Sequence, residues 1–120
     1  MRIWHEQLIP YLCQKHLCGC WREGLGMMSI LLEDKKAHRN YPATKEFEYS
    51  INYLWVRLNK VRNEMLRRGY HPKELPNPQY YKIVYSNLPP KEWQTLEEQL
   101  EVLKSKKCKC YENYKKTNSN

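Results

Sequence analysis

Apolar side chains recur at helical spacing most clearly between residues 43 and 68. Six of them are separated by four, three, four, three and four positions: Phe47, Ile51, Leu54, Leu58, Val61 and Met65. This spacing places them in one stripe along one face of a helix, as in helices that pack on a core. Gly69 suits the left-handed residue that ends a helix, and Pro72 cannot continue one. The pattern predicts a helix over residues 43–68.

Two further patterns predict helices on either side of it. Leu8, Leu12, His16 and Leu17 recur at helical spacing around Pro10 and indicate a helix over residues 12–34, which Gly24 and Gly26 are expected to bend or break. Near the other end, a helix over 90–106 is predicted by four apolar residues that share one face: Trp93, Leu96, Leu100 and Leu103. Pro89-Pro90 suits its start, and lysines suit its C-terminal end.

Residues 70–87 contain Pro72, Pro76 and Pro78. They are predicted to form a long extended connection with a short strand at 80–85. Residues 117–120 are predicted to be a disordered tail. The expected fold is all-α: a compact three-helix single domain over residues 1–116, with a long wrapping loop before the third helix.

The charge of the chain points to a nucleic-acid partner. Twenty-one Lys and Arg outnumber 13 Asp and Glu, which gives a formal net charge of +8, and ten Tyr and four Trp are available to stack on bases. The alternative is a basic protein whose aromatic side chains fill its core. The chain lacks an apolar run long enough to span a bilayer and opens without a signal-peptide pattern. We therefore expect a cytoplasmic monomer that has no membrane partner.

The chain has five cysteines, and an odd number cannot all form disulfides within one chain. Because the signal-peptide pattern is also missing, we favour reduced thiols. Two Cys-x-Cys pairs, Cys18 with Cys20 and Cys108 with Cys110, are able in principle to form a four-thiolate zinc site. On a helix, however, Cys18 and Cys20 point about 200° apart. We therefore favour small buried or half-buried thiols and keep a zinc-stabilised interaction protein as an alternative.

Common enzyme signatures such as a phosphate-binding glycine loop or a zinc-protease motif are missing from the sequence. His5 and His16 have no evident third metal ligand nearby. The α-amine of Met1, expected to be retained because Arg2 follows it, has a reference pKa of about 7.7–8.0 and is a competent nucleophile near neutral pH. Arg22-Glu23 offers a phosphate anchor and an acid/base group, although taken alone such a pair is usually a solvated surface pair.

The order of several short motifs resembles the small phage-type pyrimidine-dimer DNA glycosylases with abasic-site lyase activity, the endonuclease V family of pyrimidine-dimer enzymes. The matching segments are Arg2-Ile3, His16-Leu17, Trp21-Arg22-Glu23, Arg68-Gly69-Tyr70 and an aromatic, Lys-rich C-terminus that includes Tyr111, Tyr114, Lys115 and Lys116. The resemblance covers about the first 75 residues, and beyond them it concerns composition only. Bacterial proteins that open with Met-Arg-Ile-Trp-His are similar too.

The resemblance implies that an N-terminal α-amine attacks C1′ of the damaged nucleotide and that the resulting imine undergoes β-elimination. Carried onto this sequence, Met1 is the nucleophile and Glu23 the catalytic acid/base, with no metal and no cofactor. The same resemblance places Arg2, Lys15, His16 and Arg22 on the face that binds damaged double-stranded DNA.

The sequence departs from the family at three places. Met1 stands where the family has a small residue, Lys15 stands where a Gln is expected, and Gly24 to Gly26 follow the glutamate in place of a further basic residue. Alternatives to the pyrimidine dimer are an abasic site or an oxidised base. A non-catalytic DNA-binding module is the alternative to an enzyme.

Overall fold

The computed structural model describes residues 2–33, 35–36, 40–75 and 89–118. Helices alone make up the regular structure of these residues: η1 (Glu6–Tyr11), α1 (Gln14–Leu32), α2 (Pro42–Glu46), α3 (Ile51–Arg67), α4 (Leu96–Lys104) and α5 (Cys110–Asn118). The all-α class is therefore confirmed for the described part of the chain. The predicted number of helices is wrong, because six helical elements occur there in place of three.

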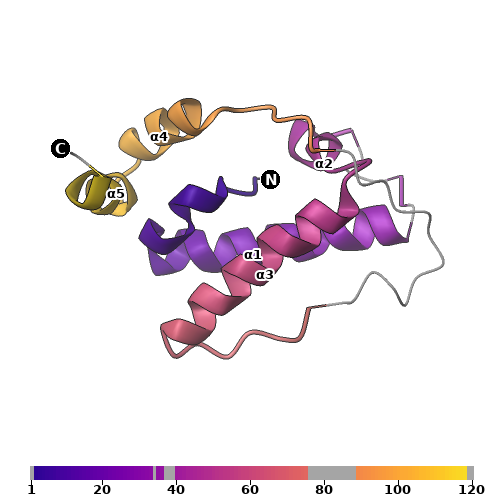
Figure 1. Cartoon of the computed structure of the whole chain (residues 1–120), viewed down its shortest axis with the longest axis horizontal. Coiled ribbons are helices and arrows are strands. Elements are labelled where there is room, and N and C mark those ends of the chain that lie inside the picture. The colour runs from indigo at the N-terminus through magenta and orange to yellow at the C-terminus, as the bar shows by residue number, and fades with distance from the viewer. Residues whose placement is uncertain (1, 34, 37–39, 76–88, 119–120) are drawn as a thin grey trace.

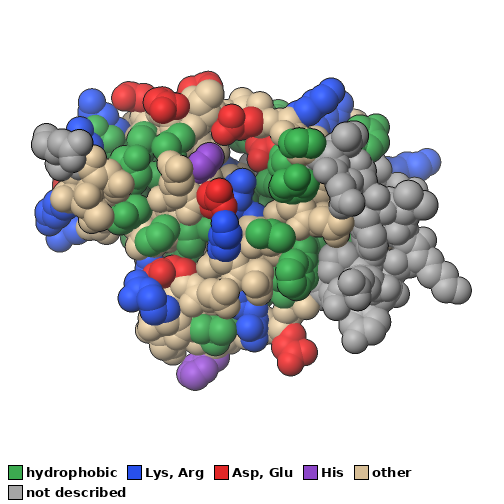
Figure 2. All heavy atoms as spheres, viewed as in Figure 1, with side chains coloured by type: hydrophobic (Ala, Val, Ile, Leu, Met, Phe, Trp, Pro, Cys, Tyr) green, Lys and Arg blue, Asp and Glu red, His purple; other side chains and the backbone are tan. Residues whose placement is uncertain are grey.

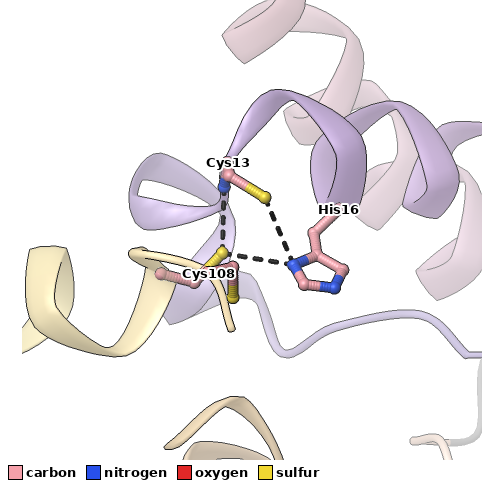
Figure 3. A group of neighbouring side chains, drawn as sticks. Cys13, His16 and Cys108 are labelled. Atoms are coloured by element: carbon pink, nitrogen blue, oxygen red, sulfur yellow. Dashed lines mark hydrogen bonds between the residues drawn. The ribbon is translucent and has the colours of Figure 1, made fainter. Parts of the chain in front are cut away.

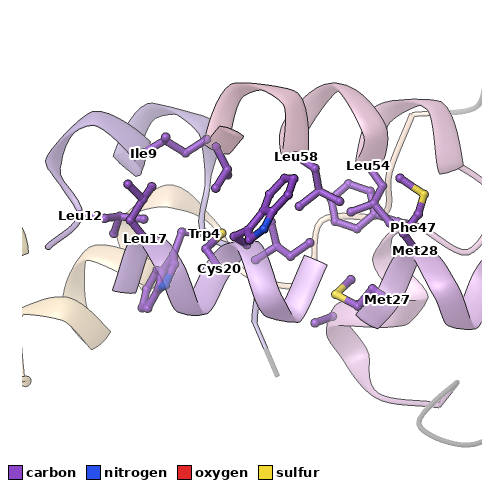
Figure 4. Close-up of a cluster of buried hydrophobic side chains, with 14 of the residues drawn as sticks. Trp4, Ile9, Leu12, Leu17, Cys20, Met27, Met28, Phe47, Leu54 and Leu58 are labelled. Atoms are coloured by element: carbon purple, nitrogen blue, oxygen red, sulfur yellow. The ribbon is translucent and has the colours of Figure 1, made fainter. Parts of the chain in front are cut away.

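The helices α1 and α3 pack against each other and form the centre of the molecule (Figure 1). The N-terminal segment and η1 lie beside this pair, and α4 and α5 lie at the same end of the molecule as η1. The apolar side chains that fill the space between α1, α3 and the N-terminal segment are almost fully buried (Figure 4): Trp4, Leu8, Leu12, Leu17, Cys20, Met27, Met28, Phe47, Leu54 and Leu58. Trp4 and Trp21 are core residues.

The helix predicted over 12–34 is confirmed as α1, which begins at Gln14 and ends at Leu32, and the separate 3-10 helix η1 precedes it. Pro10 lies inside the 3-10 helix η1 rather than at the start of α1, and Cys13 is the residue that precedes α1. Gly24 and Gly26 do not interrupt α1. A Cβ atom on Gly24 would overlap Leu58 of α3, so this glycine allows the two helices to approach closely.

The predicted helix over 43–68 is divided into α2 and α3. A regular helix would use the carbonyl of Glu46 to accept a bond from the amide of Ser50. Instead that carbonyl accepts a bond from the amide of Lys91 at 3.1 Å, and Ser50 donates to Phe47 at 2.9 Å. The apolar stripe continues through the break, since Phe47 and Ile51 are both buried.

The predicted third helix begins later than expected and is followed by another. Thr95 caps α4, its Oγ1 accepts a bond from the Glu98 amide, and the Glu98 side chain accepts one from the Thr95 amide, each at 3.1 Å. This capping box sets the start at Leu96, six residues after Pro90. Helix α5 was not predicted, and it includes residues 117 and 118 of the expected disordered tail. The strand predicted at 80–85 lies outside the described residues. Within the described part, no helix combines the length and the apolar character needed to cross a bilayer.

Candidate active site

A cleft of about 350 Å³ lies between the N-terminal segment, one face of α1 and the end of α4. Ten residues line it: Arg2, Trp4, Lys15, His16, Gly19, Cys20, Arg22, Glu23, Val102 and Lys106. Those from α1 follow the three- and four-residue spacing that places side chains on one face of a helix. The cleft therefore brings together the five described residues that the sequence nominated as catalytic or DNA-binding: Arg2, Lys15, His16, Arg22 and Glu23. Met1, the sixth, lies outside the described residues.

The cleft is positively charged, with one carboxylate among its lining residues. Arg2, Lys15, Arg22 and Lys106 contribute four cationic side chains, and Glu23 is the single acidic side chain among the ten. Elsewhere the charges are mixed: on the face that Figure 2 shows, acidic and basic side chains are interspersed, and acidic ones gather over α4. The net charge of +8 is thus not one uniform basic surface, and the cleft is a local concentration of it.

Arg2 is held between two tryptophans at the edge of the cleft. Its guanidinium carbon lies 4.9 Å from the centre of the Trp4 ring and 5.4 Å from that of Trp93. Burial lowers the pKa of the Arg2 guanidinium, which nevertheless stays charged. Its buried Nη1 atom has no hydrogen-bond partner among the described residues. A buried cationic donor without a partner is suited to pair with an anion such as a phosphate.

Glu23 is half-buried and forms no hydrogen bond or ion pair with the other described residues. Its neighbour Arg22 is exposed. The two side chains therefore do not neutralise each other as the surface pair that the sequence alone would suggest. The carboxylate is available to a substrate or to an amine in the cleft.

His16 and His5 occupy different surroundings. The His5 side chain accepts a bond from the Gln7 amide at the start of η1, and its Nε2 lies 4.0 Å from Glu92. The His16 ring packs edge-on against Trp4 at 5.7 Å, and its Nδ1 lies 3.3 Å from two sulfur atoms, those of Cys13 and Cys110. Burial and the nearby Lys106 and Lys15 lower the pKa of His16.

Three cysteines gather around His16 at the edge of the cleft. The sulfur atoms of Cys13, Cys108 and Cys110 and a ring nitrogen of His16 all lie within 4.8 Å of one another (Figure 3). The four-thiolate set that the sequence left as an alternative does not form, because Cys18 and Cys20 do not belong to this group. Burial raises the pKa of the Cys20 thiol to about 11 and that of Cys110 to about 12. The sequence pattern that was missed is Cys13-x-x-His16, which places two side chains able to bind a metal one helical turn apart.

Comparison with known proteins identifies the family. No curated protein and no solved structure matches the chain. A family model described as pyrimidine dimer DNA glycosylase matches residues 1–76, which is more than half of the 120 residues and includes eight of the ten residues that line the cleft. The chain belongs to the pyrimidine dimer DNA glycosylase family.

Proposed function

We propose that this protein is a DNA repair glycosylase that breaks an N-glycosidic bond at a pyrimidine dimer in duplex DNA and then cleaves the strand at the resulting abasic sugar. Its family is an enzyme family named for that lesion. The observation that carries the proposal is the cleft, which gathers Arg2, Lys15, His16, Arg22 and Glu23 on one surface. These are the described residues to which the family resemblance assigns roles.

The cations of the cleft would bind the DNA backbone beside the lesion. Arg2 offers a buried donor that has no partner among the described residues, and Arg22 is exposed and able to pair with a phosphate through two hydrogen bonds. Lys15 and Lys106 add charge that attracts the backbone without reading sequence. A damaged base pair opens at lower cost than an intact one, which favours the lesion over normal DNA.

The chemistry would begin at the α-amine of Met1, which a peptide bond joins to Arg2 at the cleft. The amine nitrogen forms a bond to C1′ of the damaged nucleotide while the N-glycosidic bond breaks and its electron pair leaves with the pyrimidine. The amine then loses a proton and the sugar ring opens, which leaves an imine between enzyme and sugar. Glu23 is the group we assign to proton transfer in these steps.

The imine makes strand cleavage possible because it acidifies the neighbouring C2′–H bond. Removal of that proton by Glu23 drives β-elimination, in which the C3′–O bond breaks and the phosphate leaves with its electron pair. Water finally hydrolyses the imine and restores the amine. None of these steps requires a cofactor to carry electrons, because the sequence involves no net oxidation or reduction: the oxidation state of C2′ rises by as much as that of C3′ falls.

Borohydride trapping tests the proposal directly, because borohydride reduces an imine to a stable covalent link. The full chain is incubated with duplex DNA that carries one pyrimidine dimer, an abasic site or no lesion. We expect a trapped complex with the first two duplexes and none with the third. Selective acetylation of the α-amine should abolish trapping, and Glu23→Gln should slow strand cleavage by about 10²–10⁴-fold while DNA binding persists.

Glu33→Gln is the matched control, because Glu33 is a glutamate at the end of the same helix, outside the cleft and paired with Lys35. It should cleave at the rate of the unaltered protein. Trapping at the abasic site alone would contradict dimer specificity and leave a lyase. Salt-sensitive binding with no trapping on any duplex would overturn the enzymatic proposal in favour of a DNA-binding module.

A further inference from the structure

The group formed by Cys13, His16, Cys108 and Cys110 has the composition of a metal site. We propose that it binds one structural Zn²⁺ ion, which fastens the C-terminal helices to the start of α1. Three thiols and one imidazole are a common ligand set of structural zinc, and soft thiolates favour Zn²⁺ over Mg²⁺ or Ca²⁺. The proposal does not depend on the glycosylase activity.

The spacing of the four ligand atoms suits one tetrahedral ion. In a tetrahedral zinc site, two ligand atoms lie about 3.5–3.8 Å apart, given bonds of about 2.0–2.3 Å. Here Nδ1 of His16 lies 3.3 Å from the sulfur atoms of Cys13 and Cys110, and all four atoms fall within 4.8 Å of one another. Figure 3 shows the labelled side chains pointing toward a common centre. Only small adjustments of the side chains separate this arrangement from coordination.

The backbone explains how four residues distant in sequence come together. Cys13 is the residue that precedes α1 and His16 lies one helical turn further on, so their side chains share the first turn. Cys110 is the first residue of α5, and Cys108 comes two positions earlier. Each pair is thus close to the N-terminus of a helix.

The surroundings also compensate the charge of such a site. Three thiolates and one Zn²⁺ ion leave a net charge of about −1. The amide of Cys13 donates a hydrogen bond to the sulfur of Cys110 at 3.0 Å, and Lys15 and Lys106 line the same cleft as His16. Amide donors and nearby cations of this kind orient ligands and offset their charge in metal sites.

The ion would attach α5 to the start of α1, which matters because little of α5 is buried. Cys110 is the single buried residue of α5. Tyr111 and Tyr114 pack on the core but are only half-buried, with Tyr114 edge-on against Tyr11 at 5.4 Å, and the exposed Asn113 side chain donates to the carbonyl of Tyr11 at 3.4 Å. Zinc bound at Nδ1 of His16 would also fix Nε2, which points away from the thiols in Figure 3, as a hydrogen-bond donor.

Metal analysis of the full chain, purified under reducing conditions with zinc supplied, tests the site. We expect about one zinc per chain in the unaltered protein and less than about a tenth of that in Cys108→Ser and Cys110→Ser. Cys18→Ser is the matched control, because Cys18 is half-buried like Cys108 but lies outside the group. It should retain the full zinc content. Equal loss in all three variants, or full zinc content in Cys108→Ser, would overturn the proposal.

Cobalt substitution keeps the test decisive if a cysteine variant fails to fold. With Co²⁺ in place of zinc, the unaltered protein should show thiolate-to-metal charge-transfer absorption and strong visible bands of a tetrahedral site, and added zinc should remove them. Intact-mass measurement under non-reducing conditions tests whether these thiols form a disulfide instead of binding a metal. A pair of cysteines found as a disulfide, together with a featureless cobalt spectrum, would show that the group is not a metal site.

Discussion

The helices α1 and α3 are held together by apolar packing, whereas α4 and α5 are held to the rest of the molecule by a few specific groups. Most of the buried apolar residues lie between residues 3 and 65, on η1, α1 and α3 and in the segments beside them. In contrast, the buried residues of α4 and α5 are Gln99, Leu103 and Cys110. We refer to residues 96–118 as the C-terminal arm.

The difference matters because the cleft needs both regions. The N-terminal segment and α1 supply eight of its lining residues, all within the part that the family model matches, and the arm supplies Val102 and Lys106. A stable helix pair can therefore exist without a complete cleft. Changes in the pair should alter the stability of the whole domain, and changes at the contacts of the arm should alter the cleft first.

The largest effect is expected where α1 and α3 are closest. In Gly24→Ala, the new Cβ atom would overlap Cδ2 of Leu58 and lie 3.0 and 3.2 Å from its Cγ and Cδ1 atoms. Because the Leu58 side chain is fully buried, the helices must shift to accommodate it. We expect the free energy of unfolding to fall by about 1–3 kcal/mol, measured by urea denaturation.

Gly26→Ala is the matched control for that experiment. Gly26 lies in the same helix, and a Cβ atom there would meet nothing within 4 Å. This variant should gain up to about 1 kcal/mol, because alanine favours a helix interior over glycine. If Gly24→Ala were as stable as Gly26→Ala, close packing would not be what holds α1 to α3.

The same contrast decides which elements could be predicted from the sequence. Most of α1 and α3 could be predicted because their apolar stripes record which face is buried. The break between α2 and α3 could not, because it depends on the hydrogen bond from Lys91 to Glu46, whose partners are far apart in sequence. Helix α5 escaped prediction because Cys110 is its single buried residue and leaves no stripe.

The candidate site shows the same limit on what can be predicted from the sequence. Lys15, His16, Arg22 and Glu23 share one face of α1, so their proximity follows from helical spacing. Arg2 was nominated by the family resemblance, and its place beside them requires the fold of the N-terminal segment. The contact between His16 and Cys110 spans 94 residues. A local sequence pattern carries no information about a contact over such a separation, so the zinc alternative paired Cys108 and Cys110 with Cys18 and Cys20 rather than with Cys13 and His16.

A smaller effect is expected from the hydrogen bond that attaches α4. The amide of His5 donates to Oε1 of Gln99 at 2.7 Å, and Gln99 is 3 % exposed. Gln99→Met keeps the size of the side chain but removes the acceptor, which should cost about 1–2 kcal/mol. Amide hydrogen exchange should become faster in α4 and α5 and stay unchanged in α1 and α3.

Glu97→Met provides the control for Gln99→Met, because it places the same apolar side chain at an exposed position of the same helix, two residues before Gln99. Its exchange pattern should match that of the unaltered protein. Equal acceleration in α1 and α3 after Gln99→Met would mean that the arm and the helix pair unfold as one unit, and the distinction between the two regions would not hold.

The smallest effect concerns acid stability at the end of α3. The Glu64 carboxylate accepts hydrogen bonds from Nε of Arg67 at 2.9 Å and from Nε of Arg68 at 2.8 Å, and Arg68 also donates to the carbonyl of Pro10 in η1. Burial by itself would raise the pKa of Glu64, but the hydrogen bonds from the two arginines outweigh it and lower the pKa. This link stabilises the α3–η1 contact only while Glu64 is ionised.

The sign of the pH dependence follows from that shift. Since the pKa of Glu64 is lower in the folded than in the unfolded chain, its stabilisation is complete above the unfolded value of about 4.3 and is lost as the pH falls through the folded value. Glu64→Gln should therefore lower the free energy of unfolding by about 1 kcal/mol near neutral pH and by progressively less as the pH falls below the unfolded value. Urea denaturation over a series of pH values from neutral into acid measures the difference, with Glu101→Gln on the exposed face of α4 as the control. A Glu64→Gln deficit that persisted unchanged in acid would mean that the shape of the side chain, and not its charge, holds the end of α3 against η1.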